Sequence, residues 1–262
     1  MQLPIYQVDA FTTQIFAGNP AAVMPLQAWL EDELLQAIAA ENNLSETAYL
    51  VACDKGYELR WFTPAVEVDL CGHATLASAH VLFTELDHPG DEVRFQTNSG
   101  ELTVTRDGGE LTLDFPGVNT SAAAVDMAVC DALGAIASEV MVPGERGAAL
   151  YVFEFEEDVA ALTPDFAALK AATDYKIIAT APGDEHDFVS RFFGPQVGID
   201  EDPVTGSAHC ALVPYWAKRL GRNDLSARQI SERGGELSCR LAGERVFMSG
   251  SAVTFMTGTV TL

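Results

Sequence analysis

The sequence is poor in basic residues: 15 lysines and arginines stand against 38 aspartates and glutamates, which gives a formal net charge of −23. Nucleic acids and anionic membrane surfaces are bound through basic patches, so this balance argues against both as partners. The same charge repels an anionic ligand at long range. Local dipoles, rather than the field of the whole protein, would have to hold such a ligand.

Targeting and membrane signals are also missing. Residues 1–11 contain Pro4 and Asp9 and have neither a basic start nor an apolar core, so we expect no signal peptide. No apolar run approaches the roughly 20 residues that span a bilayer. The five cysteines are scattered and form no CxxC pair, which argues against a zinc ribbon and a disulfide framework. We therefore expect a cytoplasmic protein.

Cofactor and metal motifs are absent as well. The sequence has no GxxxxGK[ST] phosphate loop and no HExxH pattern. His73 and His80 are seven residues apart and share a helix face, but nothing supplies a third and a fourth ligand. We predict neither a metal site nor a cofactor.

The most informative stretch that is present runs from Gly72 to Thr84, which contains no Asp, Glu, Lys or Arg. A helix on the surface of a soluble protein has a polar face, so an uncharged helix is expected to be enclosed by protein. Gly72 allows another group to approach the backbone, and the free N–H groups of the first turn need an acceptor. This pattern predicts a buried helix whose start is suited to an anion.

A second stretch, residues 205–216, repeats this design. Pro203 holds Asp202 in an extended conformation, and Thr205 is a suitable N-cap for an uncharged helix. Pro214 is expected to kink the helix or to end its regular part. Two uncharged helices with an acid near each start indicate two similar half-structures.

The rest of the chain reads as strands on both sides of each uncharged helix. The predicted strands are 2–11, 21–25, 47–52, 57–63, 92–97, 101–105, 111–115, 139–142, 148–155, 176–180, 187–193, 228–233, 237–241 and 244–249, with one or two more in 252–262. Further helices are predicted at 31–41, 121–133 and 165–172.

Five segments, in this order along the chain, resemble those of the PhzF-like isomerases, relatives of diaminopimelate epimerase. They are residues 16–20 (FAGNP), 43–47 (NLSET), 62–68 (FTPAVEV), 71–75 (CGHAT) and the stretch from RFF at 191 to DPVTGS at 207. The resemblance implies an α+β, diaminopimelate epimerase-like fold. In that fold two pseudo-symmetric domains each wrap a twisted sheet or barrel around a central helix, and the active site lies in the cleft between them. We expect domains at 1–118 plus 250–262 and at 119–249.

The resemblance also assigns residues to the site. By position alone, a solvated connector is the better interpretation of Glu46 and a core histidine that of His73, whereas Asp202 could equally be a residue that only complements a helix dipole. The resemblance places Glu46 at the acid/base glutamate of the family, His73 at a substrate-contacting histidine and Asp202 at a site aspartate. A buried carboxyl can exchange protons near neutral pH. The positive helix end should lower the pKa of His73 and keep its ring neutral.

The remaining candidates lie at the two helix starts. N–H groups of Gly72, Gly206 and Ser207 are suited to bind a substrate carboxylate. Diaminopimelate epimerase and proline racemase work with two cysteines, one at each helix start. This chain has Cys71 at the first start and no thiol at the second, which argues against a two-thiol racemase. A helix start can lower the pKa of a thiol, so Cys71 stays a candidate.

The resemblance therefore implies a cofactor-independent isomerase that moves a proton between carbons of a small carboxylate-bearing metabolite. Two alternatives stay open: a non-catalytic small-molecule-binding protein of the same fold, and an epimerase or racemase that uses Cys71 with a carboxylate partner. The expected ligand is a small anionic substrate. We expect no nucleic acid and no membrane as partners, and a homodimer is left open.

Overall fold

The structure is a computed structural model that describes residues 1–144 and 147–262. Its backbone separates into two compact units, which are considered one at a time. Unit 1 comprises residues 1–115 and 248–262, and unit 2 comprises residues 116–247. The sequence predicts two domains, at 1–118 plus 250–262 and at 119–249. Whether these parts fold separately stays a prediction.

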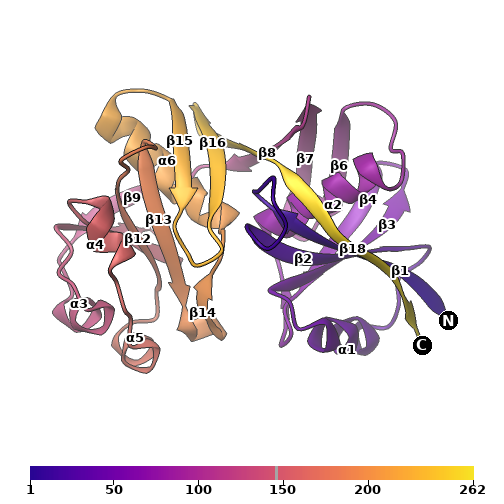
Figure 1. The fold of residues 1–262 in the computed structure, drawn as a ribbon, viewed down its shortest axis with the longest axis horizontal. Coiled ribbons are helices and arrows are strands. Elements are labelled where there is room, and N and C mark those ends of the chain that lie inside the picture. Colours follow the sequence, from indigo (N-terminus) through magenta and orange to yellow (C-terminus); the bar gives the residue numbers. More distant parts are fainter. Residues whose placement is uncertain (145–146) are drawn as a thin grey trace. The chain divides into compact units, whose positions relative to one another are not determined.

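Unit 1 is a set of strands around one buried helix (Figure 1). Its strands are β1 (Gln2–Ala10), β2 (Asn19–Leu26), β3 (Glu46–Cys53), β4 (Gly56–Phe62), β5 (Glu67–Val68), β6 (Glu92–Thr97), β7 (Gly100–Asp107), β8 (Glu110–Pro116) and β18 (Ala252–Thr261). Its helices are α1 (Asp32–Asn42) and α2 (Gly72–Thr84). Strand β1 runs antiparallel to β2 and β18, β2 runs parallel to β3, and β3 runs antiparallel to β4.

Helix α2 is the buried helix of unit 1, as its lack of charge predicts. Every residue of α2 except His80 and Thr84 is buried, and the helix packs against β1, β2, β3, β7 and β18. Its polar side chains need partners in this environment. The hydroxyl groups of Thr75 and Ser78 donate to the carbonyls of Cys71 and Ala74, at 2.5 and 2.7 Å. These bonds satisfy the hydroxyls without any contact to water.

Unit 2 has a larger share of helix. Its strands are β9 (Thr120–Ala123), β10 (Glu139–Pro143), β11 (Ala148–Val152), β12 (Lys176–Pro182), β13 (Phe188–Gly194), β14 (Ile199–Asp202), β15 (Asp224–Gln229), β16 (Gly235–Ala242) and β17 (Arg245–Gly250), the last of which reaches the unit boundary. Its helices are α3 (Met127–Leu133), α4 (Glu156–Ala160), α5 (Phe166–Ala172), the 3₁₀ turn η1 (Pro195–Val197) and α6 (Gly206–Leu220).

Helix α6 is the central helix of unit 2 and packs against β15 and β16. Trp216 fixes its second half, because its ring stacks on Phe188 at a centroid distance of 5.7 Å and an angle of 3°. The indole N–H donates to the hydroxyl of Thr180 at 3.0 Å, so the buried polar edge of the ring has a partner. Pro214 lies inside α6, which continues to Leu220, so the proline does not end the helix as the sequence allowed.

The predicted helix at 121–133 is wrong in its first half. Residues Thr120–Ala123 form β9, which pairs antiparallel with β10, and the helix starts only at Met127. Asp126 caps it, because its carboxylate accepts the N–H of Ala128 at 2.9 Å. The alanines favour a helix locally, but pairing with β10 outweighs that preference. The short helix α4 is a further difference from the elements predicted from the sequence.

The tail after Gly250 forms one strand, β18, where the sequence allowed one or two. Its register with β1 runs from Gln2 opposite Thr261 to Ala10 opposite Ala252, so the chain returns to its beginning within unit 1. Within the ranges that the structure describes, no helix is both long and apolar enough to cross a membrane.

Candidate active site

The start of α2 brings two predicted residues together. Glu46 is the first residue of β3, and His73 lies in the first turn of α2. Both are buried, with 8% and 3% of their surface exposed, and Nε2 of His73 lies 3.1 Å from Oε2 of Glu46. Neither of these two atoms has a further hydrogen-bond partner among the described residues. The pair therefore keeps hydrogen-bonding capacity for a ligand.

The other ring nitrogen of His73 faces two further groups. The amide Nδ2 of Asn19 donates to Nδ1 at 3.1 Å, and Sγ of Cys71 lies 3.5 Å from Nδ1. When Nδ1 accepts in this way, the proton of the neutral ring lies on Nε2, on the side of Glu46. In the protonated ring Nδ1 also donates, so the amide of Asn19 then has to present its oxygen.

The turn at residues 16–20 brings Asn19 to the ring. Phe16 and Gly18 both have positive φ, 71° and 64°, and the N–H of Phe16 donates to Oδ2 of Asp9 at 3.0 Å. A Cβ at Gly18 would lie 2.2 Å from the carbonyl oxygen of Ala10, so only glycine fits there. The FAGNP segment thus forms a turn that places the buried side chain of Asn19 beside His73.

The structure corrects two expectations about protonation. Burial alone lowers the pKa of His73, but the facing side chains of Cys71 and Glu46 raise it well above its ordinary value, so the neutral ring expected from the helix dipole is wrong. Burial raises the pKa of the Cys71 thiol to about 11, and the charge of Glu46 adds to this, so the expected lowering at a helix start is also wrong. Near neutral pH the thiol therefore keeps its proton.

The same three side chains have one ligand atom each within 4.8 Å of the others, and all three are buried. The carboxylate faces Nε2 of His73 and the thiol faces Nδ1, on the opposite side of the ring. A zinc ion uses one nitrogen of a histidine. The arrangement therefore suits proton movement along the ring better than shared coordination of a metal.

The start of α6 has a different construction. Asp202 ends β14 and is 7% exposed, and Thr205 occupies the N-cap position. Its hydroxyl does not cap the helix; it donates to Oδ2 of Asp202 at 2.5 Å. The hydroxyl thus orients the carboxylate of Asp202.

Gln229 completes this arrangement and was missed by sequence reasoning. Its amide Nε2 donates to the carbonyl of Asp202 at 2.7 Å and to the hydroxyl of Thr205 at 3.2 Å, and its Oε1 accepts the N–H of Thr205 at 2.8 Å. The signal was the alternation in β15, where Leu225, Ala227 and Gln229 point inward. A glutamine in the third of these inward positions indicates a buried amide that is held by hydrogen bonds.

His209, one turn into α6, was also missed. It is fully buried, and its Nδ1 donates to the carbonyl of Thr205 at 2.9 Å. Burial lowers the pKa of His209 to about 4, so the ring is neutral under ordinary conditions. Unit 2 thus holds a neutral histidine at its helix start, whereas unit 1 holds one with a raised pKa.

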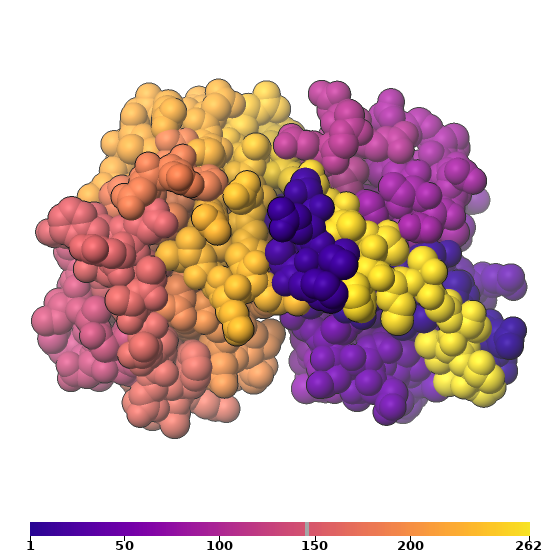
Figure 2. All heavy atoms as spheres, in the orientation of Figure 1, coloured from indigo at the N-terminus to yellow at the C-terminus, as the bar shows by residue number. Residues whose placement is uncertain are grey.

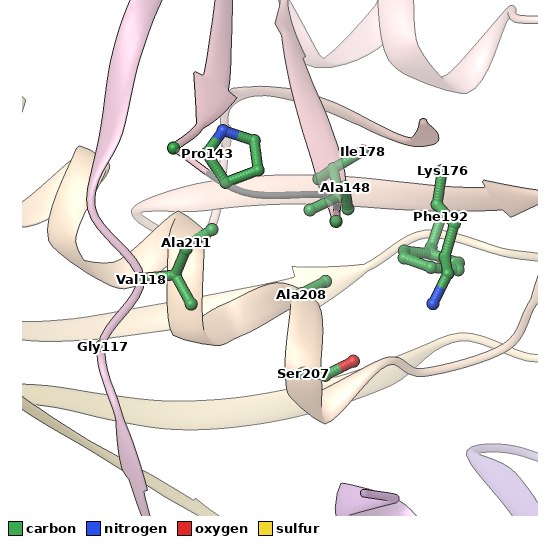
Figure 3. Close-up of a pocket in the computed structure, with 12 residues that line it drawn as sticks. Gly117, Val118, Pro143, Ala148, Lys176, Ile178, Phe192, Ser207, Ala208 and Ala211 are labelled. Atoms are coloured by element: carbon green, nitrogen blue, oxygen red, sulfur yellow. The ribbon is translucent and has the colours of Figure 1, made fainter. Parts of the chain in front are cut away.

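Gly206 and Ser207 form the first turn of α6, and Ser207 is exposed. Ser207 lines a pocket of about 500 Å³ within unit 2 (Figure 3). Most of the lining is apolar, from Val118, Ile178, Phe192, Ala208 and Ala211 among others. Lys176, at the start of β12, is the one cationic side chain among the lining residues that the structure describes.

The predicted residues therefore form two groups. Glu46, Cys71 and His73 meet around the start of α2, with Gly72 between the last two, and Asp202, Gly206 and Ser207 lie at the start of α6. A cleft that joins the two helix starts, which the resemblance implies, stays a prediction.

Each unit places strands around a central helix with a polar first turn, which is the plan of the diaminopimelate epimerase-like α+β fold. A search against protein families matches residues 8–258 to PhzC-PhzF, the phenazine biosynthesis-like proteins. The chain belongs to this family.

The relatives are similar over their whole length. An uncharacterised isomerase of Pseudomonas aeruginosa is 54% identical, with all of both chains covered. A crystal structure of a PhzF-family protein from Enterococcus faecalis is 46% identical and matches with a TM-score of 0.96, again over all of both chains. A hydroxyproline epimerase from Agrobacterium vitis shares the fold alone, at 12% identity and a TM-score of 0.63 over 99% of this chain and 92% of that one. The family and these relatives indicate an isomerase in the general sense.

Proposed function

We propose that the protein is a cofactor-independent isomerase that moves a proton between two carbons of a small carboxylate-bearing metabolite. The observation that carries the proposal is the buried pair of Glu46 and His73, 3.1 Å apart, with hydrogen-bonding capacity left on the facing atoms. Proton transfer at carbon needs a carboxylate that is shielded from water and within reach of a substrate. Glu46 supports this role by its burial.

Glu46 is the proposed proton carrier. Its carboxylate takes a proton from one carbon, the electron pair of the C–H bond passes into the substrate, and the resulting carboxyl returns the proton to a second carbon. His73, with its raised pKa, contributes positive charge beside this step. Such a charge stabilises negative charge that develops on the substrate.

The start of α6 is proposed to hold the substrate rather than to exchange protons. The first-turn N–H groups at Gly206 and Ser207 suit a carboxylate, and the neighbouring pocket is largely apolar. Asp202, oriented by Thr205, would accept a hydrogen bond from a hydroxyl or amine on the substrate. The proposal assigns both helix starts to one substrate, as the resemblance implies.

One observation favours the alternative that uses Cys71. Its Sγ lies 3.5 Å from Nδ1 of His73, so the ring connects the thiol to Glu46. Against it stands the raised pKa of the thiol, about 11, which leaves little thiolate at neutral pH. The alternative of a non-catalytic binding protein predicts ligand binding without any exchange at carbon.

The test follows deuterium from D₂O into carbon-bound positions. A pool of small carboxylic acids is incubated with the wild type to find a substrate, and single substrates are then followed by NMR. We expect Glu46→Gln to lower incorporation at least about 100-fold while substrate binding stays nearly unchanged. Glu41→Gln, an exposed carboxylate of α1, is the control and should behave as wild type.

Two results would change the assignment. Equal incorporation by wild type and Glu46→Gln would remove Glu46 from the reaction. Loss of incorporation in Cys71→Ser, with Glu46→Gln still active, would favour the thiol mechanism. A wild type that binds acids from the pool but incorporates no deuterium would favour the non-catalytic reading.

A further inference from the structure

The pocket at the start of α6 lies between that helix and one face of the sheet of unit 2. In β12, residues 176, 178 and 180 share one face, because side chains alternate along a strand. The hydroxyl of Thr180 accepts the indole N–H of Trp216 in α6, so this face points towards the helix. Lys176 and Ile178 therefore point to the same side as Thr180, and both line the pocket (Figure 3).

Most of the pocket wall is apolar. Ile178 lies opposite Phe192 in the antiparallel pairing of β12 with β13, and Ala208 and Ala211 contribute from α6. Lys176, two residues before Ile178, is a diagonal neighbour of Phe192 on the same face of the sheet. The volume of about 500 Å³ falls within the roughly 300–1,000 Å³ that is typical of small-molecule sites. The pocket thus suits an apolar body with Lys176 beside it.

Lys176 is available to a ligand. It is half-buried, and none of the salt bridges among the described residues involves it. The chain has 38 acidic and 15 basic residues, so most cationic side chains can find a carboxylate within the protein. A lysine that lines a pocket without such a partner is suited to an anionic group that comes with the ligand.

We propose that Lys176 determines the substrate specificity of this pocket by binding a second anionic group of the substrate. The inference rests on the proposed function for the first group, a carboxylate at the first-turn N–H groups of Gly206 and Ser207. Ser207 also lines the pocket, so a ligand held there can extend along the apolar wall to Lys176. The substrate class is then an acid with two anionic groups that are separated by an apolar segment.

The charge of the chain gives this lysine a decisive effect on selectivity. A net charge of −23 repels a dianion more strongly than a monoanion. An ammonium group in direct contact with the second anion opposes this repulsion, because charges that are farther away are screened by water and salt. A dianion should therefore bind more tightly than a matched monoanion when Lys176 is present, and less tightly when it is replaced.

The test compares ligands of equal chain length that differ at one end. Adipate carries a second carboxylate, hexanoate a methyl group and ε-aminocaproate an ammonium group. Dissociation constants come from NMR titrations of the methyl-labelled full chain. We expect the wild type to bind adipate at least about tenfold more tightly than hexanoate, and ε-aminocaproate most weakly. Lys176→Met, which keeps an unbranched side chain without the charge, should reverse the order of adipate and hexanoate.

Two controls come from the same unit. Lys170→Met also removes one positive charge and should keep the wild-type order, because Lys170 is exposed on α5 and is not among the described lining residues. Figure 2 shows α5, in salmon, at the surface of unit 2. Adipate should shift the methyl signals of Ile178, whereas those of Ile177, which packs in the core on the opposite face of β12, should stay nearly unchanged.

Several results would overturn the proposal. Adipate that binds no more tightly than hexanoate, or not at all, would do so without any substitution that could affect folding. A preference for adipate that Lys176→Met leaves intact would also do so, as would binding that leaves the signals of Ile178 unchanged. Tighter binding of 5-phosphonopentanoate than of adipate, lost in Lys176→Met, would support the proposal with a phosphate as the second group.

The outcome is distinguishable from that of the proposed reaction. A preference for adipate that depends on Lys176, in a protein that exchanges no deuterium at carbon, would reject the isomerase and keep the specificity of the pocket. Deuterium exchange into acids with one anionic group, unaffected by Lys176→Met, would keep the isomerase and reject the role of this lysine.

Discussion

The starts of α2 and α6 look alike in sequence but differ in what they can do. At α2, three groups that can change protonation lie around one ring: Glu46, Cys71 and His73. At α6, Asp202 is fixed by Thr205 and Gln229, and the nearby His209 is neutral. The first start is arranged for proton exchange and the second for rigid hydrogen bonding.

The difference comes from what faces each helix start. The ring of His73 faces a carboxylate, so its pKa rises even though burial opposes this. The ring of His209 faces a backbone carbonyl and the aromatic ring of Phe188, and burial dominates. A shared fold plan therefore does not give two equivalent halves of a site. For this reason we assign proton transfer to the start of α2 and substrate positioning to the start of α6.

The largest expected effect comes from breaking the rigid start of α6. Gln229→Leu removes three hydrogen bonds and leaves the N–H of Thr205 and the carbonyl of Asp202 without this partner. We expect a loss of about 4 kcal/mol in the free energy of unfolding, measured by urea denaturation. Gln96→Leu, at a half-buried position of β6, is the control and should stay within about 0.5 kcal/mol of wild type. Equal urea midpoints for the two variants would contradict the rigid arrangement.

The next largest expected effect is the loss of stability at low pH that is linked to His209. Its folded-state pKa of about 4 lies below the ordinary 6.5, so the unfolded chain binds the proton more readily. The stability linked to this ring is complete above pH 6.5 and is lost as the pH falls towards 4, by about 3 kcal/mol. His209→Gln should lose less stability than wild type over this interval, measured by urea midpoints at each pH. The same pH slope in both proteins would show that the ring does not titrate as described.

A smaller effect tests the thiol at α2. With its pKa raised to about 11 from an ordinary 9, Cys71 should react with a disulfide reagent at pH 7 at least about 100-fold more slowly than the exposed Cys53. Mass spectrometry of the labelled peptides measures both rates in one sample. Glu46→Gln should speed labelling of Cys71, because the charge of Glu46 contributes to the raised pKa. Rapid labelling of Cys71 in the wild type would instead favour the mechanism that uses this thiol.

The smallest expected effect is the pH dependence of stability that is linked to His73. It has the opposite sign to the pH dependence that is linked to His209. Its raised pKa stabilises the fold below pH 6.5, and this contribution is lost as the pH rises through the folded-state value. NMR titration of the ring protons should place its midpoint above that of a free histidine. Glu46→Gln should lower this midpoint by at least about one pH unit, because it removes a charge 3.1 Å away. An unchanged midpoint would show that Glu46 is not the charge that acts on the ring.

Some features of this protein follow from local patterns in its sequence. The absence of charge in residues 72–84 predicted the enclosed helix α2, because no face of it can meet water at low cost. The turn at residues 16–20 depends on Gly18, which adopts a conformation and a close approach that only glycine allows. The motif order also predicted the family, which the match over residues 8–258 confirms.

Other features depend on contacts between residues that are distant in the sequence, and local patterns do not predict them. Ala122 and Ala123 were predicted to be helical but belong to β9, because β10 pairs with them. Gln229 contributes to the start of α6 because β15 places it there. The direction of the pKa shift at His73 depends on the neighbouring Cys71 and on Glu46, which lies 27 residues earlier in the chain. A helix dipole can be read from a sequence, but a charge 3.1 Å away outweighs it, and only the fold decides which charge that is.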